Sequence, residues 1–366
     1  MRHSTGLTPQ GTDARVTLAA VLHHLAFAAG LAVLSAAVVR LMIGVRVMDR
    51  PDPRKAHTLP TPKGGGVGVV VAFLVGVAVL YRVAAFARLA DPYFRGVIEA
   101  SIAIAVVAFL DDLKDWNFSV KLIAQILAAL VAVTSGIYLH DYSVPYVGTL
   151  PIGWLGPPLT VAWIVFATNA MNFIDGLNGL AGGVSLIAAV GLCFLAATHD
   201  GWFAYAASLM LAAGLIGFLP FNFPRARIFL GDVGSQFCGF MLAVLGVVAS
   251  RFEGVSLSFL LVPMLLSGVL FDVAFTLVRR ALAGERLTLP HRGHLYQVVQ
   301  RSGVPVPVVT LVHWVFAAFG FVCCLVFIAA PANLKPYVPA LTLLPQMTWL
   351  GFVAERARRA GIERWG

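Results

Sequence analysis

Apolar runs of about twenty residues recur along this 366-residue chain, separated by short polar segments. A helix needs roughly 20 apolar residues to cross a bilayer, where every backbone polar group must be bonded within the protein. The runs are continuous rather than alternating, which favours helices over barrel strands. We therefore predict an all-α integral membrane protein, a polytopic bundle of about 11 transmembrane helices. The predicted spans are 17–42, 64–86, 94–110, 120–138, 155–170, 180–198, 202–220, 235–250, 256–277, 306–328 and 337–353.

The composition agrees with this class, since 59% of the residues are hydrophobic and only 12% are charged. Such values exclude a soluble globular chain and a disordered one. The formal net charge of +9 comes largely from Lys and Arg in every second loop. Cationic loops stay in the cytoplasm, so we place the 43–63 loop and the C-terminus there and the N-terminus in the periplasm. This distribution accounts for the basicity, and we expect no nucleic-acid partner. We predict one transmembrane domain, 1–366, with its motifs in 46–304.

Acids, amides and glycines gather in five polar islands, all on the predicted cytoplasmic side. They are 46–66, 111–121, 169–179, 222–235 and 279–304. Ionisable groups at membrane depth cost about 2.5–3.5 kcal/mol each, so they usually mark function. A transporter would carry polar groups near mid-membrane. The one-sided pattern favours an enzyme whose active-site cleft opens on the cytoplasmic face.

The longest loop on the opposite side is 141–152. It has short β-prone runs around Gly148, which predicts a small hairpin.

Two adjacent acids, Asp111 and Asp112, end the third predicted span. Adjacent carboxylates suit a divalent cation, or like-charge repulsion that raises the pKa of one of them. On a helix they diverge by about 100°, so only one needs to face a given substrate. The alternative is a helix end that simply meets water.

The third island, 169–179, has polar residues spaced by three: Asn169, Asn172, Asp175 and Asn178. If helical, they share one face. Interhelical hydrogen bonding by amides is a structural alternative. Four polar residues in ten, followed by a glycine-rich stretch, exceed what packing needs and favour a functional role.

The fourth island, 222–235, ends in Gly231-Asp232-Val-Gly234-Ser235. Its glycines would expose backbone N–H groups at a helix start that Ser235 can cap, and such a start suits a phosphate. Asp232 would then hold Mg²⁺ bridging that phosphate. The alternative is an ordinary turn.

The first and last islands combine cations with histidines: Lys55 and His57 in one, and His291, Arg292 and His294 in the other. The first also contains three consecutive glycines. Both offer donors for phosphates and sugar hydroxyls, although cationic loops also anchor to anionic lipid. Together with Mg²⁺-binding acids at a membrane surface, they describe phosphoryl transfer from a soluble nucleotide to a lipid acceptor.

In this order the motifs resemble those of the polyprenyl-phosphate N-acetylhexosamine-1-phosphate transferases, of the glycosyltransferase family 4 type. The order is Asp49…Arg54-Lys55-x-His57…Gly64-Gly65, Asp111-Asp112, Lys121, Asn169-x-x-Asn172-x-x-Asp175-Gly176-x-x-Gly179-Leu180, Gly231-Asp232-x-Gly234-Ser235 and His291-Arg292-x-His294. The superfamily includes undecaprenyl-phosphate GlcNAc-1-phosphate transferases and the phospho-MurNAc-pentapeptide translocase. The likeness covers about 46 to 304.

The resemblance implies transfer of a sugar-1-phosphate from a UDP-N-acetylhexosamine to undecaprenyl phosphate, with release of UMP. It implies Mg²⁺ as cofactor, with Mn²⁺ as an alternative. The location it implies is the bacterial cytoplasmic (inner) membrane, with multiple passes through the lipid bilayer. A homodimer is compatible with it.

Residue roles follow motif by motif. The metal ligands would be Asp232 and Asp175. The catalytic residues would be Asp111, Asp112 and Asp175. Asp111 and Asp112 would act near the lipid phosphate, one of them as a base. Asn172 would lie by the diphosphate and Asn178 near the uridine. Further substrate contacts would come from Lys55, His57, Lys121, Asn169, His291, Arg292 and His294.

One departure from the family pattern concerns Tyr296, which stands where a second histidine often stands. This is similar to the branch that starts O-antigen or capsule chains on modified N-acetyl sugars, and it argues against the MurNAc-pentapeptide substrate. A translocase-type transferase and, from another class, a secondary transporter are the alternatives.

Overall fold

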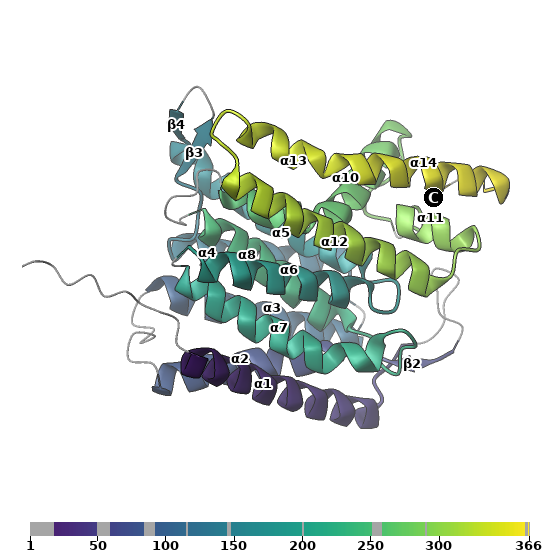
Figure 1. Cartoon of the computed structure of the whole chain (residues 1–366). Coiled ribbons are helices and arrows are strands. Elements are labelled where there is room, and N and C mark those ends of the chain that lie inside the picture. Colours follow the sequence, from purple (N-terminus) through teal and green to yellow (C-terminus); the bar gives the residue numbers. More distant parts are fainter. Residues whose placement is uncertain are drawn as a thin grey trace, which may run out of the picture.

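The computed structural model describes residues 18–49, 59–83, 92–114, 116–144, 148–199, 201–250, 258–289, 291–362 and 365. The first half contains α1 (Leu18–Val45), β1 (Met48–Asp49), β2 (Thr61–Pro62), α2 (Gly66–Val83), α3 (Pro92–Lys114), α4 (Phe118–Thr134), β3 (Asp141–Val144), β4 (Gly148–Pro151), η2 (Gly153–Leu155) and α5 (Gly156–Ile174). The second half contains α6 (Leu180–Ala197), α7 (Trp202–Asn222), α8 (Gly231–Ala249), η3 (Ser258–Leu260), α9 (Leu261–Leu265), α10 (Ser267–Leu282), α11 (Leu295–Arg301), α12 (Val306–Ala329), η4 (Lys335–Tyr337), α13 (Val338–Leu341) and α14 (Leu343–Arg359). The long helices stack as a bundle with roughly aligned axes (Figure 1).

Seven helical segments of the described chain are long and apolar enough to cross a membrane. They correspond to seven of the predicted spans: α1, α2, η2 with α5, α6, α7, α8 and α12. The chain is therefore a polytopic membrane protein. The number of spans and the side that each end faces stay predictions.

The other four predicted spans are helical but less regular. α3 carries Arg95 and Glu99 near its start, and α4 is apolar but only 17 residues long. The predicted span 256–277 is broken at Leu266 between α9 and α10, and 337–353 is broken at Thr342 between α13 and α14. The apolar runs 256–277 and 337–353 suggested single spans, but in the described residues each contains two helices.

The core of the bundle is α8, which is buried on all sides from Val233 to Ala249. It packs against α2, α3, α5 and α6. An all-round apolar helix is expected in such a central position. Whatever fixes the first turn of α8 therefore fixes the centre of the molecule.

The glycine tract of the first island is a packing element. The N–H groups of Gly65 and Gly66 donate to the carbonyls of Phe229 and Leu230, just before α8. A Cβ on Gly66 would lie 2.2 Å from the Cα of Gly234, so α2 and α8 approach closely only because both residues are glycines. These glycines thus join two helices.

The hairpin predicted around Gly148 is confirmed. β3 pairs antiparallel with β4, with Asp141 opposite Pro151 and Val144 opposite Gly148. It lies at the end of the bundle opposite to β2 and α11 (Figure 1).

Replacing Gly66 with alanine should destabilise the protein by about 1–3 kcal/mol, because the new methyl group forces α2 away from α8. The measurement is the melting temperature of detergent-solubilised protein. Gly30→Ala is the matched control, since Gly30 is also helical but has open space around its Cβ position. Equal melting temperatures for both variants would contradict the close approach.

Candidate active site

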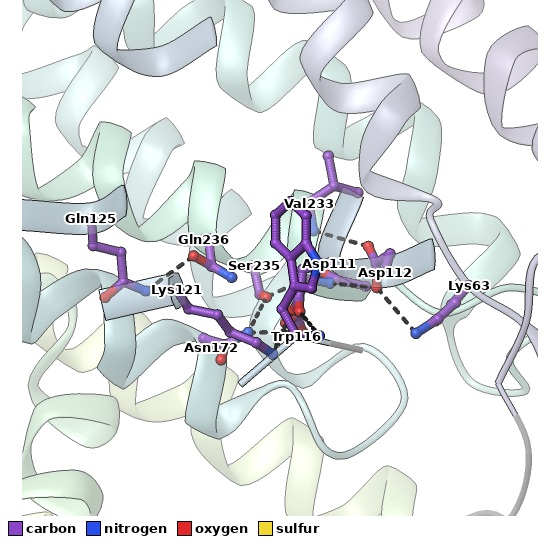
Figure 2. A network of polar contacts seen from close by, with 12 residues as sticks. Lys63, Asp111, Asp112, Trp116, Lys121, Gln125, Asn172, Val233, Ser235 and Gln236 are labelled. Atoms are coloured by element: carbon purple, nitrogen blue, oxygen red, sulfur yellow. Dashed lines mark hydrogen bonds and ion pairs between the residues drawn. The ribbon is translucent and has the colours of Figure 1, made fainter. Parts of the chain in front are cut away.

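Side chains from three helices meet at Asp232, in the first turn of α8. Lys121 of α4 places its Nζ 2.8 Å from Asp232 Oδ2, and the Nδ2 of Asn172, on α5, donates to Asp232 Oδ1 over 3.1 Å. Lys121 also lies 2.5 Å from Asp111 Oδ2, so one ammonium group bridges two carboxylates. Figure 2 shows this network from close by. Residues far apart in the sequence thus form one polar cluster.

The two adjacent acids at the end of α3 have different partners. Asp112 accepts the backbone N–H of Asp232 and of Val233, over 3.2 and 3.1 Å, and its Oδ1 lies 3.6 Å from Lys63 Nζ. Asp111 accepts the N–H of Trp116 over 2.7 Å (Figure 2). Both carboxylates are buried. The divergence expected from helix geometry is present, but neither side chain simply meets water.

The expectation that Ser235 caps α8 is wrong. Its hydroxyl donates back to the carbonyl of Gly231 over 3.1 Å, while the Asp112 carboxylate accepts the N–H groups of the first turn. Gly231 has a positive φ of 77°, and a Cβ there would lie 2.7 Å from Asp112 Oδ2. The helix start is therefore occupied by a protein carboxylate rather than open for a phosphate, because Asp112 supplies the compensating negative charge.

Asp175 follows the last residue of α5 and accepts the N–H of Gly231. Burial and the negative charges of Asp232 and Asp112 raise the pKa of the Asp175 carboxyl well above its usual value, and the Gly231 donor opposes this shift. Asp175 therefore lies near Asp232, the residue with which the family resemblance groups it.

The amides of the 169–179 island divide between two environments. Asn172 donates to both Asp232 and Ser235 and belongs to the acid cluster. Asn169, one turn earlier, donates to Gln125 Oε1 over 2.5 Å, and Gln125 donates to Gln236 over 3.0 Å. Asn169 thus makes the interhelical amide bonds considered as an alternative, and its contact with substrate stays a prediction.

The last island forms a loop and the short helix α11 beside the acid cluster. His294 is buried, and its Nδ1 lies 3.0 Å from the Oδ1 of Asp272 on α10. The Tyr296 hydroxyl donates to the carbonyl of Phe173, next to Asn172, over 2.9 Å. Sequence reasoning missed Asp272, although an acid inside a predicted apolar span is a signal that could have revealed it.

The remaining predicted residues have varied outcomes. Lys55 and His57 lie outside the described residues. Asn178 donates to the Pro224 carbonyl over 3.3 Å, and Arg292 is half-buried beside His291. Burial, together with nearby His294 and Arg280, lowers the pKa of His291 to about 4, so it is neutral at pH 7. It can donate a hydrogen bond to a phosphate but carries no charge there.

The carboxylates of the cluster fit a Mg²⁺ ion that is bound jointly by protein and substrate. Among the described residues, no three His, Cys, Asp or Glu side chains are arranged to hold a metal ion. Mg²⁺ typically binds one or two carboxylates plus substrate phosphates rather than an all-protein cage. Asp232 and Asp175 supply such carboxylates, and the described acids of the cluster outnumber Lys63 and Lys121. A divalent cation would offset this excess.

Comparison with known proteins decides the family. The model of glycosyl transferase family 4 matches residues 94–250. The chain is 31% identical to the "probable undecaprenyl-phosphate N-acetylglucosaminyl 1-phosphate transferase" of Bacillus subtilis (strain 168), over 76% of this chain and 78% of that protein. The chain belongs to glycosyl transferase family 4. Within this family it is a polyprenyl-phosphate N-acetylhexosamine-1-phosphate transferase homologue, which confirms the resemblance drawn from the motifs.

Other relatives in the family differ in the sugar that their names specify. The chain is 34% identical to the decaprenyl-phosphate N-acetylglucosaminephosphotransferase of Mycobacterium leprae (strain TN), over 69% of this chain and 70% of that one. It is 35% identical to the phospho-N-acetylmuramoyl-pentapeptide-transferase of Acetivibrio thermocellus, over 58% and 66%. The family match covers α3 to α8, the helices that carry Asp111, Asp112, Asp175 and Asp232. Membership therefore establishes a sugar-1-phosphate transferase family and a membrane enzyme.

Asp175→Asn should stabilise the metal-free protein at pH 8, because the asparagine removes a charge that burial and neighbouring acids disfavour. Since the folded-state pKa is raised, the cost of ionising Asp175 is absent well below its usual pKa of about 4 and grows as the pH rises above it. The melting temperature measured with EDTA should exceed that of wild type at pH 8, and the difference should shrink toward pH 4.

The control is Glu99→Gln, which removes an exposed acid far from the cluster. A lower melting temperature of Asp175→Asn at pH 8 would show that the Asp175 charge is favourable, contrary to the repulsion described.

Proposed function

We propose that this protein transfers an N-acetylhexosamine 1-phosphate from a UDP-sugar to a polyprenyl phosphate such as undecaprenyl phosphate, releasing UMP. The observation that carries this proposal is the cluster of Asp111, Asp112, Asp175 and Asp232 around Lys121, at one end of a membrane bundle. Phosphoryl transfer needs mainly positioning and charge neutralisation, and this cluster offers both.

N-Acetylglucosamine is the sugar that the names of the most extensively matched relatives favour. The competing donors are the modified N-acetyl sugars suggested by Tyr296 and the MurNAc-pentapeptide named for a relative that matches a shorter part of this chain. The product would initiate a lipid-linked glycan such as an O-antigen, a capsule or a cell-wall polymer. The site would face the cytoplasm of a bacterium, where UDP-sugars are made.

Mg²⁺, or Mn²⁺ in its place, would be held by Asp232 with Asp175 beside it. Its contribution would be to neutralise diphosphate oxygens. Lys121 would contact a phosphate from its position between Asp111 and Asp232, and Asn172 would orient the Asp232 carboxylate through the amide bond already described. Asn178 would lie toward the uridine.

In the transfer itself, an oxygen of the lipid phosphate would attack the β-phosphorus that bears the sugar. The bond from this phosphorus to the bridging oxygen would break, and UMP would leave with that oxygen. Asp111 is the acid we assign to the lipid phosphate, since Lys121 links it to Asp232, whereas both oxygens of Asp112 accept backbone N–H groups of α8. A two-step route through a phospho-aspartate would differ by leaving a labelled protein in the absence of lipid.

The direct test incubates the detergent-extracted protein with undecaprenyl phosphate, Mg²⁺ and a panel of UDP-N-acetyl sugars, and measures UMP. We expect release with UDP-GlcNAc or another member of the panel, and none after lipid or Mg²⁺ is omitted. Substrate flux in proteoliposomes without UMP from any sugar would instead support a secondary transporter.

Asp232→Asn should lower UMP release at least about 100-fold, the scale of losing one preorganised electrostatic contact. The fold should persist, because Asn retains an oxygen for the Asn172 amide. Glu355→Gln, a change in an exposed acid of α14, is the matched control and should keep full activity. Undiminished turnover by Asp232→Asn would remove this residue from the metal site.

A further inference from the structure

Asp272 is a buried acid that, among the described residues, is hydrogen-bonded to the last polar island and to its own helix. It lies in α10 and is 1% exposed. Its Oδ1 accepts the backbone N–H of Leu295, and its Oδ2 that of Tyr296, each over 3.0 Å. The same Oδ1 lies 3.0 Å from His294 Nδ1. A single carboxylate therefore holds both the start of α11 and the imidazole ring.

These contacts define how His294 is held. A carboxylate that accepts two backbone N–H groups is ionised and can only accept, so His294 Nδ1 must carry the hydrogen. The hydrogen bond made by one ring nitrogen sets the state and direction of the other. The contact with Asp272 is made by Nδ1. It fixes the ring at this nitrogen and leaves Nε2, on the opposite side of the ring, as the nitrogen that can face a ligand.

The His294 ring packs beside the end of α5, the helix that carries Asn172. It stacks on His291 at 4.9 Å between centroids and is 5.9 Å from Phe173, the residue after Asn172. The Tyr296 ring also stacks with the His294 ring, at 5.9 Å between centroids. The Tyr296 hydroxyl donates to the Phe173 carbonyl. This packing limits rotation of His294 and sets it next to the Asn172–Asp175 turn.

We propose that Asp272 is a positioning residue of this enzyme, which holds His294 through Nδ1 so that Nε2 faces a phosphate oxygen of the substrates. The inference rests on the proposed function, because it needs a phosphate bound beside Asn172 and Asp175. Asp272 acts only through His294 and touches no substrate. An acid that merely capped α11 would stabilise the loop without controlling the imidazole.

Asp272→Asn should lower kcat about 10- to 100-fold, the usual effect of removing a carboxylate that orients a functional histidine. An amide presents a donor where Nδ1–H or a backbone N–H needs an acceptor. Thr276→Val is the matched control: the Thr276 hydroxyl donates to the same Oδ1 over 3.3 Å but does not touch His294. It should change kcat less than about twofold. Melting temperatures identify any variant that fails to fold.

A double variant separates positioning from capping. If Asp272 acts through His294, then Asp272→Asn combined with His294→Gln should be no slower than His294→Gln alone. Losses that multiply would overturn the proposal, because Asp272 would then act independently of the ring. Normal kcat in a folded Asp272→Asn protein would overturn it as well.

A second readout does not depend on turnover. In ¹⁵N-histidine-labelled protein, the signal that disappears in His294→Gln reports which ring nitrogen carries the hydrogen. We expect Nδ1–H in wild type and a shift toward Nε2–H in Asp272→Asn. An unchanged signal in Asp272→Asn would refute the positioning role, whether or not the wild type releases UMP. A wild type that releases no UMP would count against the proposed function alone.

Discussion

The carboxylates that bind the first turn of α8 are the interaction on which the rest of the structure depends. Asp112 accepts two backbone N–H groups there, and Asp175 accepts a third from Gly231. Through these bonds the ends of α3 and α5 are tied to the start of the most buried helix, while α2 joins the same point through its glycines. Negative charge at a helix N-terminus is favourable, which helps several acids to share so small a volume.

The same arrangement holds several carboxylates close enough to repel one another. Asp175 is held close to Asp232 and Asp112, and its raised pKa expresses their mutual repulsion. Lys121 relieves part of it by bridging Asp111 and Asp232. Acids kept together at the expense of stability are typical of sites that await a cation and a phosphate. The fold thus explains why the polar residues of an apolar chain gather at one end.

Much of this could be predicted from the sequence. Alternating apolar runs and loops placed Asp111, Asp175 and Asp232 at the same end, and spacing by three put Asn172 beside Asp175. The hairpin around Gly148 and the family also followed from local residues. These features depend on periodicity, loop parity and motif order, which a single sequence displays.

The failures share a physical cause, since each depends on a partner distant in the chain. Ser235 looked like the cap of α8, but the cap is Asp112, contributed by another helix. The tract at Gly65 and Gly66 looked like a phosphate loop, yet it provides a close helix contact. Asp272 is visible as an acid inside an apolar run, but its role could not be read there because its partner, His294, lies 22 residues away. Hydrophobicity alone could not reveal the breaks at Leu266 and Thr342, because packing decides where such helices end.

The central claim is that the cluster around Asp232 transfers a phosphate together with the sugar. The most direct measurement uses UDP-GlcNAc, or whichever UDP-sugar is accepted, labelled with ³²P in its β-phosphate, and follows the label after incubation with polyprenyl phosphate. Our account predicts that the label moves to the lipid fraction while unlabelled UMP is released. Label that stays in the nucleotide as UDP, with sugar alone on the lipid, would contradict it.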